Sequence, residues 1–277
     1  MNIHVSNPKQ LKDKLNKFNK NNFHIISDFD KTLTTAFVDG NKIQSTYALI
    51  REGKYLSSDY TERSHALLDE YHPYEVSSEI PLDEKKEKMQ EWWSKHFALL
   101  VECGMNKNVI NDIIISKRLR LREGSSKFFE MLRNNNIPIL IFSAGVGDII
   151  KEFMESENKL TPNVHLISNF YNFDEHGMVT GVKDNFIHVF NKQEVEVKKT
   201  PYYDEIKGKR NIILIGDSLG DLGMSEGLKH NEIIRVGFLN DNKERLMKEY
   251  ADKFDIVILD DGSMDYVNEL LEKILAN

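Results

Sequence analysis

The chain has 277 residues, of which 40% are apolar and 29% are charged, and its formal net charge is −7. A chain of this length can bury a full core and allows about one or two domains. The acidic balance argues against a nucleic-acid polymer as partner, because binding to a phosphate backbone usually needs a basic face. We therefore expect a folded, soluble protein that handles any phosphate locally.

The N-terminal residues and the single cysteine bear on where the protein works. Residues 1–22 lack the continuous apolar core of a signal peptide, and no apolar run approaches the roughly 20 residues that span a bilayer. The single cysteine, Cys103, excludes an intramolecular disulfide and fits a reducing compartment. We expect a cytoplasmic monomer without a membrane partner.

Short apolar runs rich in isoleucine and valine recur along the chain, with helical stretches between them. Continuous apolar strands that alternate with helices are typical of a parallel sheet covered on both faces. The sequence therefore predicts an α/β core. The runs are residues 23–29, 137–143, 164–170, 211–217, 233–238 and 255–259.

Residues 37–122 break this alternation, since they carry long helical patterns and no convincing buried strand. We interpret them as an inserted helical cap domain, with a catalytic core formed by residues 1–36 and 123–277. Pro73 and Pro81 predict a connection over residues 74–80, with a second helix that begins near Pro81. Residues 171–190 hold Asp-Glu-His-Gly between two extended stretches and predict a small β-hairpin.

Two carboxylates, Asp28 and Asp30, follow the first of these apolar runs directly. A carboxylate at the C-terminal edge of a parallel strand projects into the crevice where open α/β sheets bind ligands. One of the two could attack a substrate while the other supplies a proton. Taken alone, the pair could equally cap a helix or shape a turn.

Polar residues of matching types follow two further strands. Ser143 precedes Ala-Gly-Val-Gly-Asp and the start of a helix, a combination that can bind an anion or simply cap the helix. Asp217 and Asp221 follow a later strand and would approach Asp28 and Asp30 if the two strands pair. Clustered carboxylates repel one another unless a cation neutralises them, and an oxygen-only set suits Mg²⁺.

Lys192 ends an extended apolar stretch between the serine and the last pair of aspartates. A lone lysine is most often a solvated surface charge. Transfer of a phosphoryl group, however, spreads negative charge over its oxygens, and a fixed ammonium stabilises that charge.

The order Asp-x-Asp-x-Thr, strand-terminal serine, lysine and Gly-Asp-Ser-x-Gly-Asp resembles the haloacid dehalogenase superfamily of aspartate-nucleophile phosphatases. More specific motifs are Phe-Ser-Ala-Gly-Val-Gly-Asp at 142–148, His-Val-Phe-Asn-Lys at 188–192 and Gly-Phe-Leu-Asn-Asp at 237–241. These resemble the pyrimidine 5'-nucleotidase family of the cytosolic 5'-nucleotidase III type, over nearly the whole chain. The resemblance implies a Rossmann-like parallel sheet core with an inserted helical cap domain and a small β-hairpin.

The resemblance also implies roles for the core residues. Asp28 would be the nucleophile and a Mg²⁺ ligand. Asp30 would be the proton donor, and its backbone carbonyl would also touch the metal. Asp217 would complete the protein's share of the metal shell, supported by Asp221.

The phosphate would be held by Ser143 and Ala144 and neutralised by Lys192. In the cap, Glu75 stands where the family places the glutamate that recognises the base. His96 stands where relatives commonly place a serine that contacts substrate. Lys31 occupies a position that is usually apolar in the family, so the entrance departs from the pattern.

The resemblance implies a Mg²⁺-dependent 5'-nucleotidase that acts on nucleoside monophosphates, with CMP and UMP ranked first. A preference for 7-methylguanosine monophosphate is the alternative, favoured if Trp92 or Trp93 faces the base. Each of these tryptophans and Tyr74, taken singly, is better explained as part of an ordinary core face, although we expect at least one of the three to face the nucleotide. Two further alternatives are another small-molecule phosphatase, such as a phosphoserine phosphatase, and a module that binds nucleotide without turnover.

Overall fold

The centre of the molecule is a seven-stranded sheet, and the computed structural model describes residues 2–42, 45–77, 79–184, 186–192, 197, 200–226 and 229–276 of the chain. Six strands are parallel, and β1 runs antiparallel to β11 at one edge. The strands, in spatial order, are β1 (Ile3–Val5), β11 (Ile256–Leu259), β10 (Glu232–Leu239), β9 (Asn211–Gly216), β2 (Phe23–Ser27), β5 (Ile139–Val146) and β6 (Val164–Asn169).

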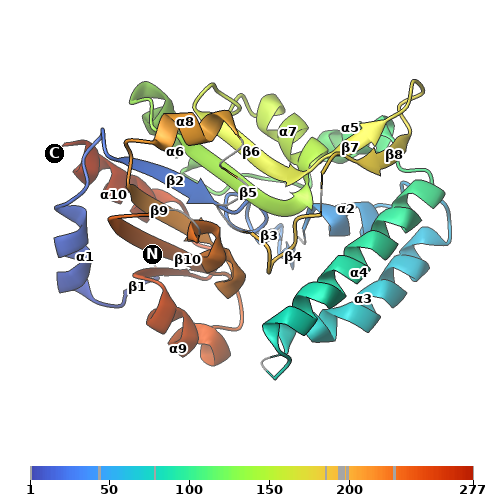
Figure 1. Ribbon diagram of the computed structural model, residues 1–277, viewed down its shortest axis with the longest axis horizontal. Coiled ribbons are helices and arrows are strands. Elements are labelled where there is room, and N and C mark those ends of the chain that lie inside the picture. The colour runs from blue at the N-terminus through green and yellow to red at the C-terminus, as the bar shows by residue number, and fades with distance from the viewer. Residues whose placement is uncertain are drawn as a thin grey trace.

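Helices cover both faces of this sheet (Figure 1). The reason is visible in β2 and β9, where every residue is buried and neighbouring residues face opposite sides. Ile25 packs in the large core cluster, whereas Ile26 packs in the cluster on the other face. The first face carries α1 (Pro8–Leu15), α6 (Ser125–Asn134), α7 (Gly147–Ser156) and α10 (Asp265–Leu275), and the second carries α8 (Pro201–Ile206) and α9 (Lys243–Lys253).

The segment predicted to be the cap is helical and contains α2 (Thr46–Glu52), α3 (Tyr60–Val76), α4 (Leu82–Glu102) and α5 (Lys107–Ile115), preceded by a short hairpin of β3 (Phe37–Val38) and β4 (Asn41–Lys42). Figure 1 shows α3 and α4 side by side, away from the central sheet. Tyr71 from α3 packs with Met89 and Trp92 from α4 in a separate buried hydrophobic cluster. The division at residues 36–37 and 122–123 stays a prediction.

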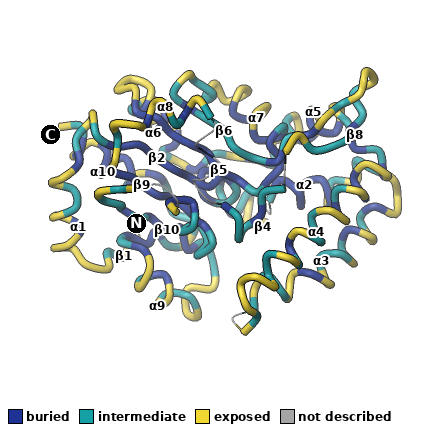
Figure 2. Tube along the Cα trace, viewed as in Figure 1, coloured by how far each residue is buried: buried dark blue, intermediate teal, exposed yellow. Residues whose placement is uncertain are grey.

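The predicted strands and hairpin are confirmed, with bounds that differ by a few residues. The hairpin consists of β7 (Tyr171–Phe173) and β8 (Val179–Val182); Asn185, within the predicted excursion, lies outside the described residues. Buried strands appear in the dark blue of Figure 2, framed by the exposed faces of α1 and α9. β1 was not predicted, because three residues with alternating exposure give too short a pattern.

The predicted connection over residues 74–80 is wrong at its start, because α3 continues through Pro73 to Val76. A proline one turn from the helix end removes only one helical hydrogen bond. The packing of Tyr74 against the cluster that contains Tyr71 stabilises this last turn. The second helix begins at Leu82, directly after Pro81, as predicted. Ser78 lies outside the described residues. No described helix is both long and apolar enough to cross a bilayer.

Candidate active site

A cavity of about 500 Å³ lies between the carboxyl ends of the central strands and the helices α2, α3 and α4. Its lining includes every residue that the sequence predicted for catalysis, substrate or metal. On the core side these are Asp28, Asp30, Ser143, Ala144, Lys192 and Asp217, and on the cap side Glu75 and His96. The structure thus brings the predicted residues together, while their roles stay predictions.

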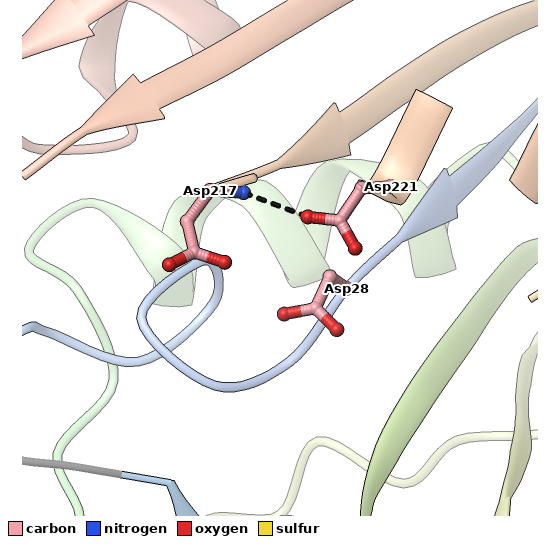
Figure 3. Close-up of side chains that lie close together, drawn as sticks. All are labelled: Asp28, Asp217 and Asp221. Atoms are coloured by element: carbon pink, nitrogen blue, oxygen red, sulfur yellow. Dashed lines mark hydrogen bonds between the residues drawn. The ribbon is translucent and has the colours of Figure 1, made fainter. Parts of the chain in front are cut away.

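Three carboxylates gather at the bottom of this cavity. Asp28 follows β2, Asp217 follows the adjacent β9, and Asp221 lies in a 3₁₀ helix (Leu219–Ser225) after it. Each offers an oxygen within 4.8 Å of the others, and Figure 3 shows the three side chains converging. Pairing of β2 with β9 creates this cluster, which could hold a metal ion.

Asp221 has both carboxylate oxygens engaged. Its Oδ2 accepts from the backbone N–H groups of Asp217 at 3.1 Å and Ser218 at 2.9 Å, and from Ser218 Oγ at 2.9 Å (Figure 3 draws the first of these). Its Oδ1 accepts from Lys192 Nζ at 2.9 Å. Asp221 is therefore the most fully engaged carboxylate of the three.

Lys192 lies against the predicted nucleophile. Its side chain is 4% exposed, and its ammonium donates to Asp28 Oδ1 as well as to Asp221. Burial opposes the charge, but the attraction of Asp221 and Asp28 raises the pKa of Lys192 above its usual value. A charged ammonium is thus fixed where a phosphate bound to Asp28 would lie.

Asp30 lines the same cavity, but its carboxylate faces the start of α2 rather than the other three. Both of its oxygens accept from the backbone N–H of Thr46 at 3.2 Å, and Thr46 Oγ1 donates to Oδ2 at 3.4 Å. Burial raises the pKa of Asp30 to about 6, against the effect of the Thr46 hydrogen bond. A carboxyl group with this pKa can exchange a proton near neutral pH.

The loop after β5 fits closely around these groups. Ser143 is buried, and its Oγ accepts from the backbone N–H of Gly145 at 3.0 Å. A Cβ atom on Gly145 would lie 2.5 Å from Thr46 Oγ1 and 3.0 Å from Asp30 Oδ2. Only glycine allows this close approach, so the predicted phosphate loop packs directly against Asp30, the predicted acid.

Aromatic side chains form the cap wall. Trp92 and Trp93 both line the cavity and lie parallel, with centroids 5.7 Å apart and planes inclined by 14°. The ring of Trp93 also stacks on that of His96, with centroids 5.9 Å apart, and its centroid lies 4.4 Å from that of Tyr47. Tyr74 packs with both tryptophans in the hydrophobic cluster between α3 and α4 but is not among the residues that line the cavity.

The polar groups of the cap wall are partly paired. His96 Nε2 lies 3.0 Å from the Tyr60 hydroxyl, and burial lowers the pKa of His96 to about 3, so the ring is neutral. Glu75 Oε2 lies 3.1 Å from Nδ1 of His72, a contact that raises the pKa of His72. Among the described residues, the other carboxylate oxygen of Glu75 has no hydrogen bond.

The sequence did not single out three residues at or next to the cavity. Thr46 orients Asp30, while Arg51 and His72 bring two further basic side chains to the cavity. The pair Ser45–Thr46 before an apolar run is a helix-start pattern, but no local pattern shows that this helix faces Asp30. His72 and Arg51 look like ordinary surface positions in the sequence.

Comparisons with known proteins agree with this geometry. A model of the family described as pyrimidine 5'-nucleotidase (UMPH-1) matches residues 31–275. A human 7-methylguanosine phosphate-specific 5'-nucleotidase is 38% identical over 263 residues, 95% of this chain and 88% of that protein. The Xenopus laevis 7-methylguanosine phosphate-specific 5'-nucleotidase A is 35% identical over 278 residues, 99% of this chain and 96% of that protein.

Solved structures give the same result. A crystal structure of cytosolic 5'-nucleotidase IIIB bound to cytidine has a TM-score of 0.88 and 33% identity, and the match covers 98% of this chain and 93% of that one. A phosphoserine phosphohydrolase-like protein from Francisella tularensis has a TM-score of 0.56 at 18% identity, over 90% of this chain and 99% of that one, and shows the fold alone. The chain belongs to the pyrimidine 5'-nucleotidase (UMPH-1) family and is a 5'-nucleotidase, a phosphoric monoester hydrolase of the haloacid dehalogenase type.

Proposed function

We propose that this 5'-nucleotidase acts through a phosphorylated Asp28 and prefers 7-methylguanosine 5'-monophosphate. The observation that carries the base preference is the pair Trp92 and Trp93, which lines the same cavity as the carboxylate cluster. The names of the human and Xenopus relatives point to the same base. This proposal takes up the alternative that the sequence ranked below CMP and UMP.

The chemistry needs a nucleophile and a proton donor on different sides of the phosphoryl group. Asp28 attacks phosphorus, and the bond to the 5'-oxygen breaks while Asp30 donates its proton to that oxygen. Water then attacks the aspartyl-phosphate, with Asp30 now acting as the base. A pKa of about 6 suits Asp30 to both steps, because either protonation state is accessible near neutral pH.

A divalent cation fits this donor set. Asp28 and Asp217 offer carboxylate oxygens, and no histidine or cysteine lies in the cluster among the described residues. Such oxygen donors suit Mg²⁺, which would neutralise charge on the phosphate oxygens. Asp221 would act from behind, since its oxygens are already engaged.

The phosphate is held by the loop after β5 and by Lys192. Ser143 and Ala144 line the cavity beside the carboxylates and would contact the phosphate oxygens. The Lys192 ammonium, now on Asp28 and Asp221, would also neutralise the charge that spreads over the equatorial oxygens.

The cap wall offers what a methylated guanine requires. Methylation at N7 makes the base cationic, and a cation on an indole face gains about 0.5–2 kcal/mol, or roughly two- to thirtyfold in affinity. Glu75 would accept from the ring N–H and amino edge of the base. His96 is neutral and adds no opposing charge, and Arg51 is paired with Glu52 at 3.0 Å.

Pyrimidine nucleotides are the second candidate substrates. The related cytosolic 5'-nucleotidase IIIB was crystallised with cytidine, and Glu75 could also accept from the amino group of cytosine. Phosphoserine is disfavoured, because an amino-acid pocket needs a carboxylate clamp rather than a stacking surface. We expect a cytoplasmic enzyme that works on free nucleotides as a monomer.

The test compares kcat/KM for 7-methyl-GMP, GMP, CMP, UMP and AMP with Mg²⁺ present. We expect 7-methyl-GMP to lead and its ratio to GMP, which lacks only the methyl group and the charge, to exceed about tenfold. In Trp93→Leu this ratio should shrink, whereas the rate for CMP should fall less. Glu75→Gln should lower kcat/KM for every nucleotide whose base donates a hydrogen bond to the carboxylate.

Each other outcome has a definite meaning. If CMP or UMP leads, the tryptophan pair serves as core and the enzyme is a pyrimidine nucleotidase. If AMP or GMP leads, or if Glu75→Gln leaves rates and ranking unchanged, the assignment of the cap wall is wrong. Turnover in excess chelator equal to that with Mg²⁺ would contradict the metal site.

A further inference from the structure

Arg122 is a fully buried cation outside the cavity lining, at the point where the chain returns from the inserted helices to the core. Its side chain is 0% exposed, and its guanidinium lies 4.0 Å above the ring of Phe238. A buried charge is expensive unless it is paired and hydrogen-bonded.

All five N–H donors of this guanidinium have acceptors, which is the maximum for arginine. Two of the acceptors are carbonyl groups of the loop that follows Asp30, and the others belong to the loops after β10 and β11. The contacts are Nε to Thr32 O at 2.7 Å, Nη1 to Asp261 Oδ1 at 2.7 Å and Gly262 O at 2.8 Å, and Nη2 to Asn240 Oδ1 at 2.7 Å and to Lys31 O.

The loop held in this way is not relaxed. Lys31 has a φ of 59°, in the left-handed region that lysine rarely adopts. Its carbonyl accepts from Arg122 and from Asn240 Nδ2 at 3.0 Å, and its N–H donates to Thr34 Oγ1 at 2.9 Å. A conformation of this kind persists when the surroundings over-determine it. Asp30, the residue before, is carried on the same turn.

Asp261 also binds the segment by which the chain leaves the core for the inserted helices. Its Oδ1 accepts from the backbone N–H of Ala36 at 2.8 Å as well as from Arg122, and its Oδ2 accepts from Phe37 N–H at 3.0 Å. The backbone of Arg122 in turn donates to Leu33 O at 2.9 Å. One ion pair thus ties together both connections of the inserted helices and the turn after Asp30.

We propose that Arg122 and Asp261 are positioning residues that hold Asp30 at the distance from the leaving 5'-oxygen that proton transfer requires. The inference rests on the proposed role of Asp30. Neither residue touches the substrate, so both act through the backbone of residues 31–37. Lysine cannot replace Arg122, because an ammonium has three donors and no planar fork.

A dependence on the leaving group separates positioning from mere stability. A nucleoside alkoxide needs the proton from Asp30, whereas p-nitrophenolate leaves without it. In Arg122→Lys and in Asp261→Asn we expect kcat/KM for the nucleotide to fall by about tenfold or more, and that for p-nitrophenyl phosphate by less than about threefold. Asp30→Asn should show the same pattern more strongly.

The matched control is Arg120→Lys, two residues away, where an exposed arginine pairs with Asp39 at 3.1 Å; this variant should keep the wild-type rates for both substrates. Circular dichroism checks that each variant is folded at the assay temperature, and Asp261→Asn serves if Arg122→Lys does not fold. An equal loss for both substrates, or no loss, would overturn the inference. If Asp30→Asn itself keeps full activity, the proposed function fails instead.

Discussion

Replacing Asp221 by asparagine removes the carboxylate oxygen that accepts from Lys192 and so helps to hold this lysine beside Asp28. The shape is unchanged, but only one oxygen remains. That oxygen is required by the N–H groups of Asp217 and Ser218 and by the Ser218 hydroxyl, all of which donate to Oδ2. The new amide NH₂ then faces the Lys192 ammonium. Because both groups are donors, the hydrogen bond of 2.9 Å between Lys192 and residue 221 is lost.

The magnitude follows from that one lost contact. A hydrogen bond to a charged group contributes about 1.5–3 kcal/mol, so we expect Asp221→Asn to lower the free energy of unfolding by about 2 kcal/mol. Loss of a donor aimed at transition-state charge costs about 10²–10³ in kcat. Since Asp28 still holds Lys192, we expect a smaller fall in kcat, roughly ten- to hundredfold.

The assay measures kcat at saturating nucleotide and Mg²⁺, together with urea unfolding. Ser218→Ala is the graded comparison, because it removes one neutral hydrogen bond to Asp221, worth about 1 kcal/mol, and leaves the contact with Lys192. If Asp221→Asn keeps kcat within about twofold of wild type, or if Ser218→Ala loses as much activity as Asp221→Asn, then Asp221 does not hold Lys192 in place for catalysis.

Three further predictions concern single positions. Lys31→Met should lower the Mg²⁺ concentration for half-maximal activity, because the ammonium near Asp217 repels a metal; an unchanged or higher requirement contradicts this. Burial lowers the pKa of His96 to about 3, so between pH 6.5 and that value only the unfolded state binds its proton and stability falls by about 1.4 kcal/mol per pH unit. His96→Gln should therefore flatten the decline in urea stability from pH 7 to pH 5, and an unchanged slope would count against it. Gly145→Ala should cut kcat at least about tenfold in a folded protein, because the new Cβ would lie 3.0 Å from Asp30 Oδ2; wild-type kcat would show that the loop yields.

The strands and the placing of carboxylates at their ends could be predicted from the sequence, whereas the order of the strands in the sheet could not. Short continuous apolar runs that alternate with helical patterns are typical of strands covered on both faces, and the carboxyl ends of paired parallel strands meet at one edge. The pattern therefore places Asp28 and Asp217 at strand ends but leaves open whether their strands are neighbours, a condition that the pairing of β2 with β9 meets. Strand β1 could not be predicted, because three residues pair through backbone groups that any sequence offers.

Long-range side-chain partners escaped the sequence for a different reason. Lys192 was expected near a phosphate, but its bonds to Asp28 and Asp221 depend on a loop whose path has no periodicity. Arg122 was only a domain boundary in the sequence, since its acceptors come from loops more than 80 residues away. Pro73 misled because a helix tolerates proline near its end when the side chains around it pack.

We expect Asp28 to carry the phosphoryl group during turnover, which acid quenching followed by peptide mass spectrometry can detect. Enzyme mixed with saturating nucleotide and Mg²⁺, then quenched within a turnover, should yield one phosphorylated peptide, with the added mass on Asp28. Asp28→Asn should yield none and show no turnover. Phosphate on another residue, or undiminished turnover by Asp28→Asn, would contradict the account.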